Sequence, residues 1–218
     1  MDSDSIEEKA KKWVKENKRV LIEKFASLSQ FPGVSNPFTI FMAGSPGAGK
    51  TEFSKSWIKE YDPRTKIVRI DADEIRDMIP GYIGGNAYKF QGATTLGVEK
   101  LFDYVQDHGQ NVIVDGTFSN FYKSRQDVER AINKGRKVGI VYIYQDPKIA
   151  WEFTKKREKV EGRRVSRKMF IESFLFAKDN VNKIKSIFRD KIELHLIEKN
   201  YINELENAKF NIDMVSRM

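Results

Sequence analysis

Short apolar runs alternate with longer amphipathic segments along the middle of this chain. We expect strands at Phe38–Ala43, Lys66–Ile70, Asn111–Asp115, Lys137–Tyr144 and Lys191–Ile197. Between them, apolar residues recur at helical spacing, which predicts helices at 52–60, about 94–106, 124–133, 147–157 and 169–187. This alternation predicts an α/β fold with a parallel sheet of about five strands flanked by helices.

The two ends of the chain lie outside this alternation. Residues 5–30 read as one amphipathic helix, with Ser5 and Glu8 as a capping box and lysines on its polar face. Such a face can contact a membrane or a nucleic acid, but the apolar stripe more often packs on the domain. We expect an N-terminal helix and linker over 1–36, the main domain over 37–200, and a tail over 201–218 that contains a short helix.

A glycine-rich motif follows the first strand. Residues 44–51 fit G-x-x-x-x-G-K-[ST], and the residues are Gly44, Ser45, Pro46, Gly47, Ala48, Gly49, Lys50 and Thr51. Glycines let successive N–H groups point at one centre, where they and a helix N-terminus bind phosphate oxygens. Lys50 would reach the β- and γ-phosphates, and the Thr51 hydroxyl would bind Mg²⁺. Because strand, loop and helix all agree, we favour a nucleotide-binding P-loop over a chance glycine-rich turn.

Acidic residues close two of the predicted strands. Ligands of parallel α/β sheets bind outside the carboxyl ends of strands, where Asp71 and Asp73 lie. Asp73 also fits the N-cap of a short helix, and the two roles are compatible. Asp115 has the form of a Walker B residue that helps to hold Mg²⁺. Thr117 and Ser119 either hydrogen-bond a substrate or only shape the turn.

Cations gather after the fourth strand, in the order Arg157, Lys159, Arg163, Arg164, Arg167 and Lys168. A solvated charge run is the usual reading of such a segment. However, arginine forks suit phosphate, and Gly162 supplies a joint. We interpret residues 155–170 as a lid that closes over a triphosphate.

The glycine-rich residues 80–95 are expected to form an irregular loop that faces the substrate.

Composition narrows the choice of partners. The 218 residues suit one α/β domain with appendages, and a net charge of +8 suits an anionic substrate, a nucleic acid or simply a basic surface. Without cysteine there are no disulfides or thiolate metal sites, and the two histidines are far apart in sequence. No apolar run is long enough to span a bilayer, and the N-terminus has no signal-peptide core. We therefore expect a cytoplasmic location, or delivery by a route that leaves no such signal.

Taken in order, these parts resemble the zeta-toxin family of P-loop kinases, within the wider group that includes polynucleotide kinase. The resemblance covers residues 36–200 and rests on the P-loop, on residues 70–73 and 114–117, and on the basic segment. It implies a three-layer P-loop kinase fold. It also implies Mg²⁺-dependent transfer of the γ-phosphate of ATP or GTP to a sugar hydroxyl of UDP-N-acetylglucosamine, and an antitoxin partner.

The resemblance also implies roles for individual residues. The catalytic residues would be Lys50, Asp73 as the base, Arg157 and Arg164, and Arg163 would join the P-loop in binding the nucleotide. Substrate would contact Asp73, Glu99, Asp115 and Thr117, and Mg²⁺ would contact Thr51 and Asp115. From periodicity alone, Glu99 is equally well a solvated carboxylate of a helix.

Several positions depart from the family pattern. The chain has Asp115 where the family usually has Glu, Ile79-Pro80 where a His-Pro pair is frequent, and Phe118-Ser119 where an arginine often contacts substrate. A polynucleotide, nucleoside or dinucleotide kinase is therefore the alternative, although the chain contains no recognisable nucleic-acid module. An alternative of another class is a nucleotide-dependent switch whose N-terminal helix binds a partner.

Overall fold

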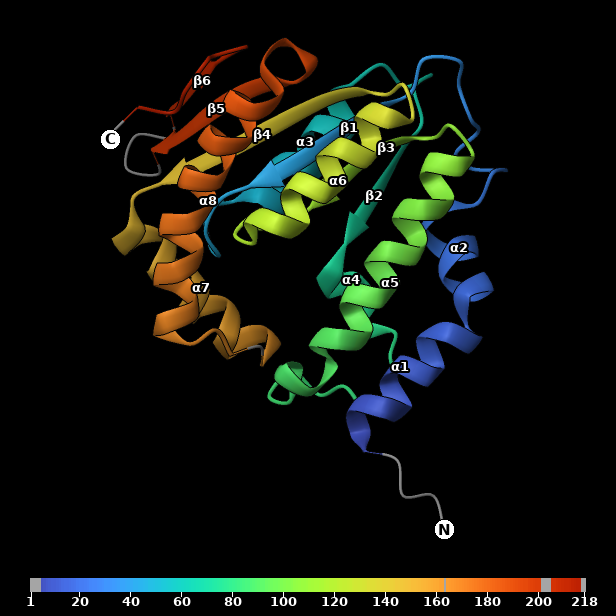
Figure 1. Ribbon diagram of the computed structural model, residues 1–218. Coiled ribbons are helices and arrows are strands. Elements are labelled where there is room, and N and C mark those ends of the chain that lie inside the picture. Colours follow the sequence, from blue (N-terminus) through green and yellow to red (C-terminus); the bar gives the residue numbers. More distant parts are fainter. Residues whose placement is uncertain (1–4, 163, 201–204, 217–218) are drawn as a thin grey trace.

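The computed structural model describes residues 5–162, 164–200 and 205–216, and it is built on one six-stranded sheet (Figure 1). The strand order is β2-β3-β1-β4-β5-β6, with β1 Phe38–Ala43, β2 Ile67–Asp71, β3 Asn111–Asp115, β4 Lys137–Gln145, β5 Glu193–Asn200 and β6 Leu205–Lys209. Strands β1 to β5 pair in parallel, as the sequence predicts. The α/β class is confirmed.

Strand β6 corrects the prediction of a short helix in the tail. It pairs antiparallel with β5, with Ile197 opposite Ala208. The open edge of a parallel sheet presents unpaired N–H and C=O groups, and a returning segment can satisfy them. The sequence of β6 has neither a helical nor an alternating apolar pattern, so this pairing is decided by the neighbouring edge.

Helices cover both faces of the sheet and make three layers (Figure 1). On one face lies α3, Lys50–Glu60, whose aromatic residues pack on a cluster that includes Met42, Ile113 and Ile143. The other face is covered by α5 Ala87–Asp107, α6 Phe121–Asn133 and α8 Arg167–Phe188, over the larger core. Apolar residues on both faces of the strands explain their continuous apolar runs.

The N-terminal segment forms two helices, α1 Ile6–Glu16 and α2 Lys18–Ala26, where the sequence predicted one. The capping box of Ser5 and Glu8 is present. The break lies at Asn17, whose backbone N–H and side-chain amide both donate to the carbonyl oxygen of Trp13 and end α1. Val14 and Leu21 are completely buried in the core shared with α5, so the expected packing of the apolar stripe on the domain is confirmed.

The remaining helices lie at the carboxyl edge of the sheet. They are α4 Ala72–Asp77 and α7 Pro147–Glu161. Elsewhere, the 3-10 turn η1 Arg189–Lys191 follows α8.

The loop predicted over 80–95 is shorter than expected, because Asn86 closes it with hydrogen bonds to Ile83 N–H and the Gly81 carbonyl. From Ala87 the chain is helical and buries Phe90.

Candidate active site

The P-loop joins β1 to α3 and turns through three glycines with positive φ. These are Gly44 at +137°, Gly47 at +72° and Gly49 at +85°, in a region that residues with a Cβ rarely adopt. Lys50 begins α3 and is 9% exposed. Its Nζ donates to the carbonyl oxygens of Gly44 at 3.0 Å and Ser45 at 2.7 Å, so the ammonium lies over its own loop.

The P-loop packs directly on α7. A Cβ added at Gly47 would collide with the carbonyl oxygen of Ala150 and would lie 2.7 Å from Thr154 Oγ1. Both of these α7 residues are buried, and Ala48 is also fully buried. The helix that leads into the predicted lid therefore begins in contact with the predicted phosphate cradle.

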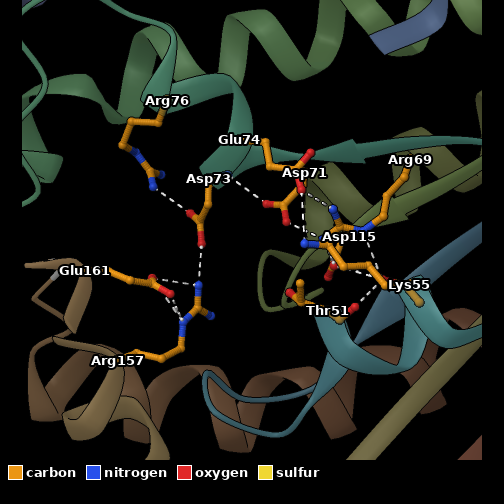
Figure 2. Close-up of polar contacts among 11 residues, drawn as sticks. Thr51, Lys55, Arg69, Asp71, Asp73, Glu74, Arg76, Asp115, Arg157 and Glu161 are labelled. Carbon is orange, nitrogen blue, oxygen red and sulfur yellow. Dashed lines mark hydrogen bonds and ion pairs between the residues drawn. The ribbon is translucent and has the colours of Figure 1, made fainter. Parts of the chain in front are cut away.

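Beside the P-loop, two carboxylates meet at the ends of neighbouring strands. Asp71 and Asp115 are paired in the register of β2 and β3. Arg69 lies between them, and its Nη2 contacts Asp71 Oδ2 and, at 2.6 Å, Asp115 Oδ2 (Figure 2). The hydroxyl of Ser54, from α3, donates to Asp115 Oδ2 at 3.2 Å. These contacts fix Asp115 under the first turns of α3, which also carry Thr51.

Burial and the neighbouring charges shift the pKa values of Asp71 and Arg69. Burial raises the pKa of the Asp71 carboxyl, and the neighbouring Asp115 carboxylate raises it further, against the opposing effect of Arg69. Burial lowers the pKa of the Arg69 guanidinium, but Asp71 and Asp115 outweigh that effect and leave it above its ordinary value. The guanidinium therefore stays charged between the two acids.

Asp73, in the first turn of α4, points away from the Asp71–Asp115 pair, and its carboxylate lies between two arginines (Figure 2). Arg76 Nη1 donates to Asp73 Oδ1 at 2.6 Å, and Arg157 Nη2 is 3.6 Å from Asp73 Oδ2. The predicted N-cap role of Asp73 is wrong. Asp71, the last residue of β2, caps α4 by accepting the N–H of Asp73 at 2.8 Å, because the helix begins directly after the strand.

Arg157 connects α7 to this carboxylate. Its Nε and Nη2 also donate to Glu161, one turn later on the same helix, with a 3.0 Å contact from Nη2 to Oε2. Burial lowers the pKa of Arg157, while Glu161 and Asp73 raise it, with a net increase. The first predicted lid arginine and the predicted base are thus already neighbours.

The rest of the predicted lid follows α7. Gly162 ends the helix at φ +70°, and Val165 packs with Ala150, Trp151 and Phe170 in a small cluster apart from the main core. A Cβ on Gly84 would lie 2.9 Å from the carbonyl oxygen of Glu161, so the 80–86 loop touches the end of α7. Arg164 is exposed. Arg163 lies outside the described residues.

The predicted substrate residues Glu99 and Thr117 lie further along the same edge. Glu99 Oε1 pairs with Lys123 Nζ at 3.0 Å, and both side chains are partly exposed. Thr117 Oγ1 is hydrogen-bonded to Ser119 Oγ at 2.8 Å, and its carbonyl oxygen accepts the N–H of Gly44 at 3.2 Å. Thr117 is thereby tied to the P-loop.

Two residues of the site were missed by sequence reasoning, namely Arg69 and Arg76. Arg76 is 2% exposed, and its Nε has no hydrogen-bond partner among the described residues. An arginine three residues after Asp73 would lie on the same face of a helix, and this spacing could have identified it. Arg69 gave no comparable signal, since a charged residue in a short strand usually faces solvent.

The donor set fits a nucleotide-bound magnesium ion. A threonine hydroxyl and a buried carboxylate are hard oxygen ligands, which Mg²⁺ prefers, and Mg²⁺ generally takes few protein ligands beside phosphates and waters. Among the described residues, no group of three or more His, Cys, Asp or Glu side chains could hold a metal ion.

Within the same residues, no helix is long and apolar enough to cross a membrane.

Comparisons with known proteins bear on the family and the fold of this chain. A sequence model of the zeta toxin family matches residues 23–206. A structure from the PezAT toxin–antitoxin system of Streptococcus pneumoniae aligns with a TM-score of 0.68 and 19% identity, over 94% of this chain and 82% of that one. A search of curated proteins returned no significant match.

Two further structures share the fold. The AvrRxo1-ORF1:-ORF2 complex with ATP aligns with a TM-score of 0.66 and 13% identity, over 92% of this chain. The Pnkp1/Rnl/Hen1 RNA repair complex aligns with a TM-score of 0.54 and 18% identity, over 68% of this chain. This chain spans 65% of the first of these chains and 46% of the second.

Proposed function

Because the chain belongs to the zeta toxin family and is a P-loop kinase, we propose that it transfers the γ-phosphate of ATP to a hydroxyl of a small nucleotide-containing acceptor. UDP-N-acetylglucosamine is the acceptor that the family resemblance favours. GTP is the alternative donor. ATP is preferred because one chain of similar fold was solved with ATP.

One observation carries this proposal, namely the meeting of Arg157 and Asp73. Arg157 belongs to α7, which packs on Gly47 of the P-loop, whereas Asp73 belongs to α4 at the end of β2. Their side chains approach to 3.6 Å. A phosphate held by the P-loop and a hydroxyl held by Asp73 would therefore meet beside the same guanidinium, as phosphoryl transfer requires.

In the proposed reaction the acceptor oxygen forms a bond to the γ-phosphorus, and the bond from that phosphorus to the β–γ bridging oxygen breaks. Asp73 orients the hydroxyl and accepts its proton, while Arg76 holds the other carboxylate oxygen. Lys50 and the P-loop N–H groups bind the phosphates, and Arg157 offsets the charge on the moving phosphoryl group.

Thr51 and Asp115 are the residues that would hold Mg²⁺. When bound, the ion neutralises phosphate charge. Asp115 is 8% exposed and is fixed by Ser54 and Arg69, so its position is set before a ligand arrives. A carboxylate held in this way requires little reorganisation on binding.

A protein antitoxin is the proposed partner, since the similar structures include a toxin–antitoxin system. Toxicity through loss of a cell-wall precursor is part of the same proposal. A cytoplasmic location stays a prediction. Expression of the chain with and without its neighbouring gene would test toxicity and its relief.

The first test is a mass-spectrometric transfer assay. The protein, ATP and Mg²⁺ are mixed with UDP-N-acetylglucosamine, nucleosides, dinucleotides and a 5′-hydroxyl oligonucleotide. We expect phosphate on the sugar nucleotide. Asp73→Asn should bind ATP normally but transfer about 10²–10⁴-fold more slowly, because the hydroxyl proton has no acceptor.

Asp107→Asn is the matched control, since it makes the same substitution at an exposed position at the C-terminal end of α5. It should transfer as the wild type does. Phosphate on a different acceptor would keep the mechanism and replace the substrate. ATP binding without transfer to any compound of the panel would contradict the proposed acceptor class and favour a nucleotide-dependent switch, whereas full turnover by Asp73→Asn would remove Asp73 as the base.

A further inference from the structure

Arg69 fills the space between three carboxylates. Its Nη2 contacts Asp71 and Asp115, its Nη1 is 2.7 Å from Glu74 Oε1, and its Nε donates to Ser54 Oγ at 3.0 Å (Figure 2). Only 9% of the Arg69 side chain is exposed. A planar guanidinium held on every nitrogen is a fixed group, unlike a surface arginine.

The position of this guanidinium matters because of the carboxylates that it joins. Asp71 and Asp115 close adjacent strands at the same register, and their side chains are 10% and 4% exposed. Two such carboxylates repel one another unless a cation lies between them. A divalent cation with oxygen ligands would favour the same bridging position.

Without Arg69, the charges of the neighbouring carboxylates would no longer be neutralised. The three carboxylates of Asp71, Asp115 and Glu74 face the guanidinium, and Lys55 Nζ lies 3.5 Å from Glu74 on the exposed side. Removing the Arg69 charge would leave the two buried acids with no cation bridging them. Their attraction for a free divalent ion would then rise steeply, since buried charges are poorly screened.

We propose that Arg69 is a built-in counter-ion that prevents the Asp71–Asp115 pair from binding free divalent cations, so that Mg²⁺ enters only with the nucleotide. This proposal rests on the proposed magnesium–nucleotide site. In it Arg69 is a positioning residue: it touches neither substrate nor nucleotide, and it holds Asp115 for a metal ion whose other ligands would be the Thr51 hydroxyl and phosphate oxygens.

The test measures binding of Mn²⁺, as a stand-in for Mg²⁺, from the electron paramagnetic resonance signal of the free ion. Without nucleotide, the wild type should bind no Mn²⁺ at micromolar concentrations. With ADP or ATP, the protein should lower the free-ion signal beyond that of a protein-free sample of the same nucleotide, which chelates Mn²⁺ by itself. Arg69→Met should bind one Mn²⁺ without nucleotide at least about tenfold more tightly than the wild type, and its thermal unfolding should shift upward with Mn²⁺.

Two control variants make the result specific. Arg69→Met combined with Asp71→Asn should lose the new Mn²⁺ site, because the bridging position needs both carboxylates. Arg64→Met makes the same substitution at a side chain that is 90% exposed and should behave as the wild type does. Neither measurement uses phosphate transfer, so failure of the proposed kinase reaction would be seen separately.

The inference is overturned if Arg69→Met binds Mn²⁺ no better than the wild type. It is also overturned if the wild type binds Mn²⁺ without nucleotide at a site that Asp115→Asn removes. Should Arg69→Met fold neither with nor without Mn²⁺, the wild-type titration decides: binding that appears only with nucleotide supports the inference, and nucleotide-free binding at Asp115 refutes it.

Discussion

Lys50 shows how a single side chain is prepared for an anion. Its ammonium donates to the Gly44 and Ser45 carbonyl oxygens and so stays over the loop that would hold the phosphates. Lys50→Ala should weaken ATP binding and slow transfer by about 10²-fold or more, because the charge that meets the phosphates is lost. Calorimetry with ATP and the transfer assay measure the two effects. Lys59→Ala, at an exposed position of the same helix, is the control, and unchanged transfer by Lys50→Ala would refute the P-loop assignment.

Arg157 carries a different prediction at the same scale. It is shared between Glu161 and Asp73, and its side chain is 40% exposed, so it can turn toward a bound phosphate at little cost. Arg157→Ala should slow transfer by about 10²–10³-fold while ATP affinity changes much less, because the guanidinium offsets charge that grows in the transition state. Steady-state kinetics separate these quantities. Lys155→Ala, on the same helix, should leave both unchanged, and a loss of affinity alone in Arg157→Ala would contradict the proposed role.

At the scale of elements, the P-loop packs tightly against α7 at a single glycine. Gly47 has φ +72°, and a Cβ there would collide with the Ala150 carbonyl oxygen. Gly47→Ala should therefore destabilise the fold by about 1–3 kcal/mol and also weaken ATP binding, because either the loop or the helix has to move. Chemical denaturation and calorimetry would show this. At Gly85 an added Cβ meets no atom within 4 Å, so Gly85→Ala should change stability little. Equal stability of the two variants would mean that the loop and helix are not coupled.

The predicted lid is an element with its own small core. Val165, Phe170 and Ala150 are buried together with Trp151 packed against them, apart from the main core. Because Ala150 and Trp151 lie in the first turns of α7 and Phe170 lies in the first turn of α8, this cluster ties the starts of the two helices together across the joint at Gly162. Movement of the segment would have to carry or break this cluster, which limits the lid motions that the fold permits.

At the scale of the whole molecule, α1 and α2 form part of the folded core. Leu21 is completely buried against the core shared with α5, whereas the adjacent Val20 is 48% exposed. Leu21→Ala should lower the free energy of unfolding by about 2–5 kcal/mol, because it leaves a cavity. Val20→Ala should change it by no more than about 0.5 kcal/mol. Thermal unfolding compares the two variants. Similar small effects would mean that the N-terminal helices are a separable appendage, as the switch hypothesis requires.

Local patterns in the sequence determined most elements of this protein. Apolar runs located β1 to β4 within a residue or two, and the glycines and Lys50 of the P-loop identified the phosphate cradle, because a tight turn and a helix start depend on neighbouring residues. The same reasoning put Asp73 and Asp115 at the carboxyl edge of the sheet. The chemical roles of these residues stay predictions, as do those of Arg164, Glu99 and Thr117.

The tertiary structure decided what depends on residues far apart in sequence. It added β6 to the edge of β5, broke the N-terminal helix at Asn17, and moved the N-cap of α4 to Asp71. It also brought Arg157 to Asp73 and placed Arg69 between Asp71 and Asp115. Periodicity reports which face of an element is apolar, but the partner of a buried charge is set by the order of strands in the sheet. Here that order put β2 beside β3, and with it an arginine between two carboxylates.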